Sequence, residues 1–125
     1  MHNRILVVDD DESMRGFLST LLQQAGYDVV TTDGLEAGVS ALEETSPDLL
    51  IADVRLGGFN GLQLIAMSPH SMPAIAMTGF PDPVLEAQAR EFGAIFLLKP
   101  FTSAELLTLV AERLRDRRAN EALLH

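Results

Sequence analysis

The hydrophobic residues of this chain gather in five short runs, which are separated by longer segments of mixed character. Each run has the length of a strand, and its nearly continuous apolar character is typical of a strand buried on both faces of a sheet. The runs are Ile5 to Val8, Val29 to Thr32, Leu49 to Ala52, Ala74 to Met77 and Ala94 to Leu98. This pattern predicts a sheet that is covered on both faces.

Most of the segments that follow these runs carry clear helix signals. In the first segment, apolar residues recur at the helical period and the pattern stops at Gly26. In the second, Asp33 is in position to cap a helix that ends before Pro47. In the fourth, Asp82 stands between two prolines, which is typical of a helix start. We therefore expect a helix after each of these strands.

The third and fifth helices are predicted from shorter signals. Pro69 closely follows the apolar stretch Leu62 to Met67, so we expect a brief third helix. Thr102 and Glu105 match the Thr-x-x-Glu capping box at the start of the fifth. Strands that alternate with helices in this way form βαβ units. The predicted fold class is therefore α/β, with a five-stranded parallel sheet between two layers of helices.

The composition is typical of one globular domain. A chain of 125 residues and 13.6 kDa, 47% of them hydrophobic, is long enough for a single core. The absence of cysteine excludes a disulfide, a thiolate metal site and a cysteine nucleophile. The net charge of −9 opposes direct contact with nucleic acid or an anionic membrane. Because the N-terminus has the pattern of neither a signal peptide nor a membrane span, we expect a cytoplasmic protein.

The polar residues at the ends of the strands point to a site at one edge of the sheet. Open α/β sheets bind ligands beyond the carboxyl ends of their strands. The first strand ends in four acids, Asp9 to Glu12, and the third ends in Asp53. The fourth ends in Thr78 and the fifth in Lys99. If the second strand lies at the sheet's edge, as in the flavodoxin-like order 2-1-3-4-5, these four ends converge on one pocket.

Each of these residues also has a purely structural explanation. Acids at a helix start are favoured by the helix dipole by about 0.3–1 kcal/mol each. Asp53 is placed to cap the glycine-rich turn that follows it, and Thr78 and Lys99 stand at ordinary strand exits. Lys99, however, is the only lysine of the chain and ends a strongly apolar strand. A flexible point charge at that position favours a functional role.

The cost of bringing the acids together also favours a functional site. Two carboxylates about 5 Å apart repel each other by roughly 3 kcal/mol at an effective dielectric constant near 20. Asp9, Asp10 and Asp53 would carry this cost with no structural need for it. Mg²⁺ removes the repulsion and accepts oxygen ligands. With Lys99, it would also let a phosphoryl group approach a carboxylate that then acts as the nucleophile.

Four separated motifs give the chain a resemblance to a known family. They are Ile5-Leu6-Val7-Val8-Asp9-Asp10, the segment from Asp53 to Gly61, Met77-Thr78-Gly79, and Phe96-Leu97-Leu98-Lys99-Pro100-Phe101. In this order they resemble the receiver domain of two-component response regulators, over residues 4 to 116. The resemblance implies the flavodoxin-like (βα)5 sandwich with sheet order 2-1-3-4-5. It predicts a receiver domain over residues 1–118 and a tail or linker over residues 119–125.

The resemblance assigns the phosphoryl acceptor and the metal ligands. It implies that Asp53 accepts a phosphoryl group from the phosphohistidine of a sensor histidine kinase or phosphotransfer protein. Asp9, Asp10, Asp53 and the backbone carbonyl of Arg55 match the residues that hold Mg²⁺. We therefore expect a signalling domain rather than an enzyme, although it catalyses its own phosphotransfer and slow autodephosphorylation.

The resemblance also assigns the residues that respond to phosphorylation. Thr78 and Lys99 match the hydroxyl and ammonium groups that contact the phosphoryl oxygens, and Phe96 matches the aromatic switch residue. Arg55 and Phe80 stand at the two positions that tune dephosphorylation, and both are bulky. The family changes the surface of the fourth helix, fifth strand and fifth helix on phosphorylation, so we expect the same surface to signal here.

Three other classes of protein are less consistent with the sequence. A flavodoxin needs hydroxyls and amides in its first loop, where this chain has four acids. The Asp9-x-Asp11 pattern is similar to the motif of phosphatases of the haloacid dehalogenase class, but such a phosphatase would give Asp53 no role. An interaction module that works without phosphorylation commonly lacks one of the residues that are complete here.

The partners follow from the resemblance only in part. A sensor kinase or phosphotransfer protein is expected upstream, and an effector domain or a separate downstream protein is expected to receive the signal. A dimer linked to phosphorylation is compatible with the family. A stand-alone receiver and a fragment of a longer regulator both fit the sequence.

Overall fold

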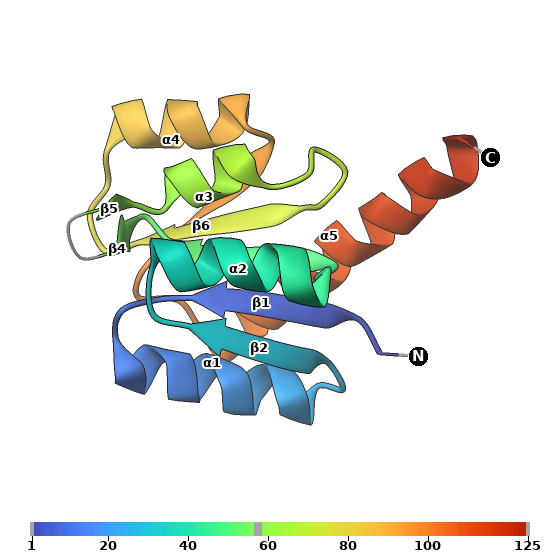
Figure 1. Cartoon of the computed structure of the whole chain (residues 1–125), viewed down its shortest axis with the longest axis horizontal. Coiled ribbons are helices and arrows are strands. Elements are labelled where there is room, and N and C mark those ends of the chain that lie inside the picture. Colours follow the sequence, from blue (N-terminus) through green and yellow to red (C-terminus); the bar gives the residue numbers. More distant parts are fainter. Residues whose placement is uncertain (1, 57–58, 125) are drawn as a thin grey trace.

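The computed structural model describes residues 2–56 and 59–124 and contains the expected parallel sheet (Figure 1). The strand order is β2-β1-β3-β6-β7, which is the predicted order 2-1-3-4-5 for the five strands of this sheet. All neighbouring strands in it are parallel. Its strands are β1 (Arg4–Val8), β2 (Asp28–Thr32), β3 (Leu49–Asp53), β6 (Ala74–Thr78) and β7 (Ala94–Leu98).

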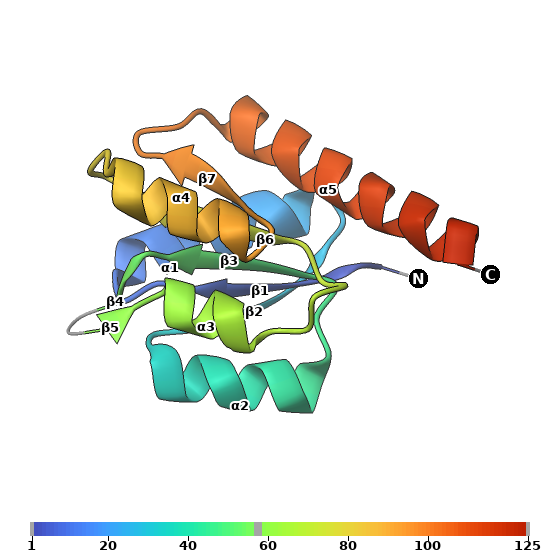
Figure 2. The same cartoon turned by 90° about the horizontal axis from the view of Figure 1, so that it is seen from above.

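Helices lie on both sides of this sheet (Figure 2). Successive residues of a strand face opposite sides, so β1 sends Leu6 and Val8 to one core and Ile5 and Val7 to the other. The first core packs against α2, α3 and α4, and the second against α1 and α5. The helices are α1 (Glu12–Gln24), α2 (Leu35–Thr45), α3 (Leu62–Met67), α4 (Pro83–Glu91) and α5 (Ser103–Leu124).

Most of the predicted helix boundaries are confirmed, and one is wrong. Gly26 follows α1 with a φ of +98°, a conformation that favours glycine. Asp82 caps α4 by accepting hydrogen bonds from Val84 and Leu85. The predicted cap of α2 by Asp33 is incorrect, because Gly34 is the N-cap residue and no side chain caps this helix. Asp33 precedes the N-cap residue by one position, so its carboxylate does not cap α2.

The last helix includes residues that the resemblance assigns to a tail or linker. α5 continues without a break to Leu124, past residue 118, and Figure 1 shows its last turns extending beyond the sheet. Just before this extension, Arg117 connects α5 to the residue that precedes β3. Its Nη1 donates to the carbonyl of Asp48 at 2.8 Å and to Asp48 Oδ1 at 3.0 Å. Among the helices of the described residues, none combines the length and apolar character needed to span a membrane.

Candidate functional site

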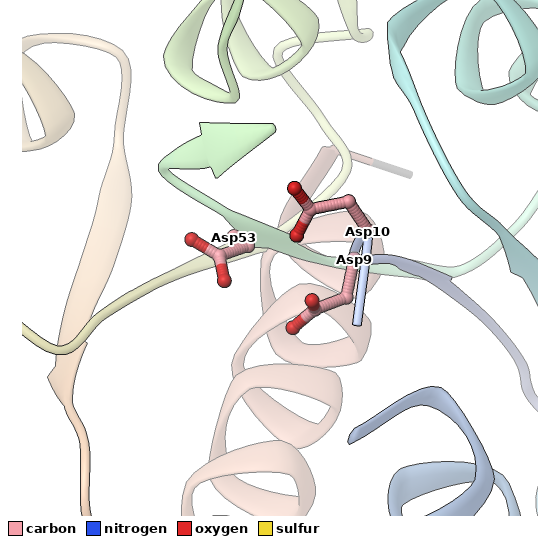
Figure 3. A group of neighbouring side chains, drawn as sticks. All are labelled: Asp9, Asp10 and Asp53. Carbon is pink, nitrogen blue, oxygen red and sulfur yellow. The ribbon is translucent and has the colours of Figure 1, made fainter. Parts of the chain in front are cut away.

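The predicted acidic cluster forms at the carboxyl ends of β1 and β3. Val8 lies beside Ala52 in the parallel register, so the residues that follow them, Asp9 and Asp53, leave neighbouring strands at the same edge. Figure 3 shows the side chains of Asp9, Asp10 and Asp53 close together, and a carboxylate oxygen from each lies within 4.8 Å of the others. The separation of about 5 Å assumed from the sequence is therefore confirmed for these atoms.

Asp9 is the most deeply buried of the three acids. Its side chain is fully buried, and its Oδ1 accepts a hydrogen bond from the backbone N–H of Asp11 at 2.9 Å. Burial raises the pKa of Asp9 above its usual range, and the N–H of Asp11 and the charge of Lys99 offset this only in part. The folded environment thus disfavours the charged form of Asp9, as is typical of a residue kept for binding or catalysis.

Lys99 joins the cluster from the end of β7. Its Nζ donates to Asp53 Oδ2 at 2.6 Å and to Asp9 Oδ2 at 3.4 Å. Burial alone would lower the pKa of Lys99, but the hydrogen bond and charge of Asp53, together with Asp9, raise it above the usual value. The ammonium of this one lysine therefore stays charged within the acidic cluster.

Thr78 lies next to Asp53 at the end of the neighbouring strand. Asp53 pairs with Met77 in the register of β3 and β6, so Thr78 is the next residue along that edge. Thr78 is 1% exposed, and its Oγ1 accepts a hydrogen bond from the N–H of Phe80 at 3.2 Å. The N–H of Lys99 in turn donates to the carbonyl of Thr78 at 2.7 Å. The ends of β6 and β7 are thus connected directly beside the acids.

Arg55 and Phe80, which belong to different loops, are in contact over this edge. The guanidinium of Arg55 lies over the Phe80 ring, 4.4 Å from its centroid, and Phe80 is 60% exposed. The N–H of Arg55 also donates to Asp53 Oδ1 at 2.8 Å. We call the Arg55–Phe80 contact the clasp. It joins the segment after β3 to the segment after β6.

The segment after Asp53 contains an element that the sequence analysis did not predict. β4 (Arg55–Leu56) and β5 (Phe59–Asn60) pair as a small antiparallel ribbon, and Gly57 and Gly58 between them lie outside the described residues. Gly61 then donates to the carbonyl of Val54 at 2.7 Å, and a Cβ on Gly61 would lie 1.9 Å from the carbonyl oxygen of Asp53. The only sequence signal for the ribbon was the Gly-Gly dipeptide between two very short arms.

Phe96 lies away from the acidic cluster. It is placed on β7 beside Ala76 and packs, half-buried, against the core under α2, α3 and α4. The structure thus brings Asp9, Asp10, Asp53 and Lys99 into one cluster, with Thr78 beside them. The roles of Phe96 as a switch and of the Arg55 carbonyl as a ligand stay predictions.

Comparison with known sequences agrees with this geometry. The model of the response regulator receiver domain family matches residues 5–111. The DNA-binding response regulator MtrA of Mycolicibacterium paratuberculosis is 37% identical over 119 residues, which cover 92% of this chain and 52% of MtrA. The transcriptional regulatory protein FixJ of Bradyrhizobium diazoefficiens is 36% identical over 116 residues, which cover 90% of this chain and 57% of FixJ. The chain spans about half the length of these curated relatives.

Solved structures confirm the fold. A CheY-like response regulator receiver domain protein from Methanospirillum hungatei JF-1 superposes with a TM-score of 0.93 at 24% identity, over 96% of this chain and 99% of that one. The chemotaxis protein CheY4 of Vibrio cholerae superposes with a TM-score of 0.79 at 29% identity, over 90% of this chain and 99% of that one. Because the family match covers most of the same residues that build the sheet and its acidic edge, this chain belongs to the response regulator receiver domain family.

Proposed function

We propose that this receiver domain accepts a phosphoryl group on Asp53 from the phosphohistidine of a sensor kinase or phosphotransfer protein, in a reaction that requires Mg²⁺. The observation that carries the proposal is the 2.6 Å contact between Lys99 Nζ and Asp53 Oδ2 inside a cluster of three carboxylates. In the reaction, a carboxylate oxygen of Asp53 forms the bond to phosphorus while the bond from phosphorus to the histidine nitrogen breaks. The imidazole leaves with the electron pair of that bond.

The donor set of the pocket fits Mg²⁺. Asp9, Asp10 and Asp53 offer only carboxylate oxygens, which hard divalent cations prefer, and Asp10 is exposed to solvent. These acids, with the carbonyl of Arg55, would hold the ion, which when bound supplies positive charge beside the incoming phosphoryl group. Lys99 supplies a second positive charge at Asp53 and holds the carboxylate in a fixed direction.

The structure favours Asp53 over Asp9 as the nucleophile. In the phosphatase hypothesis, Asp9 would be the nucleophile and Asp11 the second acid of the Asp9-x-Asp11 motif. Asp11 instead caps α1, since its Oδ1 accepts hydrogen bonds from Ser13 at 2.9 Å and Met14 at 3.4 Å. Asp9 is fully buried, whereas Asp53 keeps 7% of its surface exposed. Intact mass in acetyl phosphate tests the proposal, with one phosphoryl group expected in Mg²⁺ and none in EDTA.

Mg²⁺ is expected to raise the Tm of the unphosphorylated protein, because it binds the native acidic cluster and relieves its repulsion. At ten times the Kd, binding stabilises a protein by about 1.4 kcal/mol, which corresponds to a rise of about 4–8 °C in a small domain. Asp10→Asn should lose most of this response and melt above wild type without metal. Asp33→Asn removes an acid outside the cluster and should keep the full response. Equal Tm values for wild type with and without millimolar Mg²⁺ would exclude a metal site here.

This metal effect should depend on pH in a direction set by Asp9. Because the folded pKa of Asp9 is raised above the ordinary value of 3.8, this group stabilises the metal-free protein fully only below that value. The contribution is lost as the pH rises through the raised pKa, where the carboxylate becomes charged. Mg²⁺ should therefore raise the Tm most above the raised pKa, and acidification through it should abolish the rise.

We also propose that phosphorylation changes the surface formed by α4, β7 and α5. Thr78 leads from β6 towards α4, and Lys99 leads from β7 towards α5, so movement of either side chain towards a phosphoryl group would displace these elements. Phe96 on β7 is the proposed aromatic switch.

The switching proposal predicts where amide exchange changes. Addition of beryllofluoride with Mg²⁺ should alter exchange most over residues 79–106, because this segment runs from the residue after Thr78 to the first turn of α5. The measurement is hydrogen exchange followed by mass spectrometry. Asp53→Asn should show no change. Changes restricted to α1 and α2 would contradict the proposed switch.

The biological setting is a proposal that rests on the family. We propose a cytoplasmic domain over residues 1–118, with residues 119–125 leading towards an effector domain or acting as a tail. MtrA is named a DNA-binding response regulator and is longer than this chain. A downstream protein as the recipient, and a dimer linked to phosphorylation, are alternatives that also fit the family. The receiver itself, with a net charge of −9, is not expected to contact nucleic acid or membrane.

A further inference from the structure

Arg15 on α1 extends its side chain back to the loop that carries the acidic pair. Its Nη1 donates a hydrogen bond of 2.8 Å to the backbone carbonyl of Asp9, and its side chain is half-buried. The backbone of Arg15 is itself fixed, because its N–H donates to the carbonyl of Asp11 at 3.0 Å in the first turn of the helix. Arg15 thus connects a rigid helix to the peptide group between Asp9 and Asp10.

The other contacts of this loop explain why that connection matters. Asp9 is held at three points: its N–H donates to Thr32 at 3.2 Å, its Oδ1 accepts from Asp11, and its Oδ2 accepts from Lys99. Asp10 is the exposed member of the cluster. Because a peptide group is planar, the direction of the Asp9 carbonyl also fixes the nitrogen and Cα of Asp10. The hydrogen bond from Arg15 therefore acts on the orientation of Asp10.

We propose that Arg15 is a positioning residue for the Mg²⁺ site, since it holds the Asp9–Asp10 peptide so that both carboxylates face one ion. The inference rests on the proposed function, because it assumes that these acids bind Mg²⁺. Arg15 donates to a backbone carbonyl, so its role would be to hold a ligand in place rather than to bind the ion itself. It acts in the way that residues behind metal ligands do, by reducing the freedom of the ligand.

The charge of Arg15 and its positioning role predict opposite changes in Mg²⁺ affinity when Arg15 is replaced. The guanidinium carries a positive charge near a site for a cation, so its removal alone would favour Mg²⁺ binding. If Arg15 orients Asp10, its removal weakens binding despite that gain. The sign of the change in Mg²⁺ affinity therefore separates the two effects.

The test is calorimetric titration of the unphosphorylated protein with Mg²⁺ alone, at a temperature well below its Tm. Arg15→Met, which keeps the length of the side chain without its charge or donors, should raise the Kd about tenfold. Arg15→Lys, which keeps one charged donor, should show a smaller rise. Arg90→Met is the matched control, since Arg90 is on α4, its side chain is 68% exposed, and it forms an ion pair of 3.8 Å with Glu86 on the same helix.

A second measurement follows the loop without any metal. Amide exchange at residues 10–12 should be faster in metal-free Arg15→Met than in wild type, because the carbonyl of Asp9 has lost its donor. A role in helix stability alone would lower the Tm and leave both the Kd and this local exchange unchanged. If Arg15→Met does not fold, Arg15→Gln replaces it, as a neutral residue with a shorter reach.

The outcomes are distinct from those that test the proposed function. If wild type binds Mg²⁺ and Arg15→Met binds it equally well or more tightly, the positioning role of Arg15 is wrong and the metal site stands. If wild type does not bind Mg²⁺, the proposed function fails first, and the inference fails with it. Weaker Mg²⁺ binding by Arg15→Met, with the affinity of Arg90→Met equal to that of wild type, supports both the metal site and the positioning role of Arg15.

Discussion

Asp53→Asn is expected to abolish phosphorylation by acetyl phosphate in Mg²⁺, while wild type gains one phosphoryl group. Asparagine keeps the shape of the side chain, but its amide is a far weaker nucleophile than a carboxylate. The backbone N–H of Arg55 donates to Asp53 Oδ1 at 2.8 Å, and the amide oxygen of asparagine can accept the same hydrogen bond. The effect should therefore be chemical rather than a loss of fold. Intact mass spectrometry measures it directly.

A control for this prediction is available in the same acidic loop. Asp11→Asn also removes one carboxylate, and asparagine caps helices about as well as aspartate. Since Asp11 serves as the cap of α1, this variant should be phosphorylated like wild type. Labelling of Asp53→Asn at the wild-type level, combined with loss of labelling in Asp9→Asn, would move the nucleophile to Asp9. That result would support the phosphatase hypothesis instead.

Much of the fold and of the site is predictable from the sequence for a simple physical reason. A parallel strand buried on both faces needs a nearly unbroken apolar run, so the five strands are visible without any structure. Parallel strands also end at the same edge, so Asp9, Asp53, Thr78 and Lys99 had to meet once β2 was placed outside β1. The order of the strands was the one step that needed the family resemblance.

What the sequence did not predict depends on contacts between separate loops. The ribbon of β4 and β5 is too short to show a pattern, and Gly61 is needed only because the chain returns to the carbonyl of Asp53. The cap of α2 falls on Gly34 because the turn after β2 is one residue longer than the pattern suggests. Likewise, the sequence pattern does not indicate that Arg15, one turn into α1, donates a hydrogen bond back to the carbonyl of Asp9.

The clasp is another contact between separate loops, and we expect it to affect the lifetime of the phosphoprotein. Arg55 and Phe80, which the resemblance places at the two positions that tune dephosphorylation, are stacked on each other at the edge where Asp53 lies. We propose that in this arrangement the two side chains form one barrier to the water that would hydrolyse a phosphoryl group on Asp53. Exclusion or misplacement of that water slows attack on phosphorus.

Disruption of the clasp is expected to shorten the lifetime of the phosphoprotein. An exposed cation–π contact is worth about 0.5–1 kcal/mol, so the closed form is about two to five times as populated as the open form. If hydrolysis occurs only in the open form, Arg55→Asn or Phe80→Ala should accelerate phosphate loss about three- to sixfold. Because either change opens the same barrier, the double variant should be little faster than either single variant. The measurement is phosphate loss from the purified phosphoprotein in Mg²⁺.

The pattern of rates distinguishes the clasp from its alternatives. Phe92→Ala removes another exposed aromatic ring, at the end of α4, and should leave the rate at the wild-type value. If the rate increase in the double variant equals the product of the two single increases, Arg55 and Phe80 act independently and the clasp is not one barrier. A double variant that loses phosphate no faster than wild type would show that neither side chain shields Asp53. Coupled acceleration, with Phe92→Ala unchanged, is the result that the 4.4 Å stack predicts.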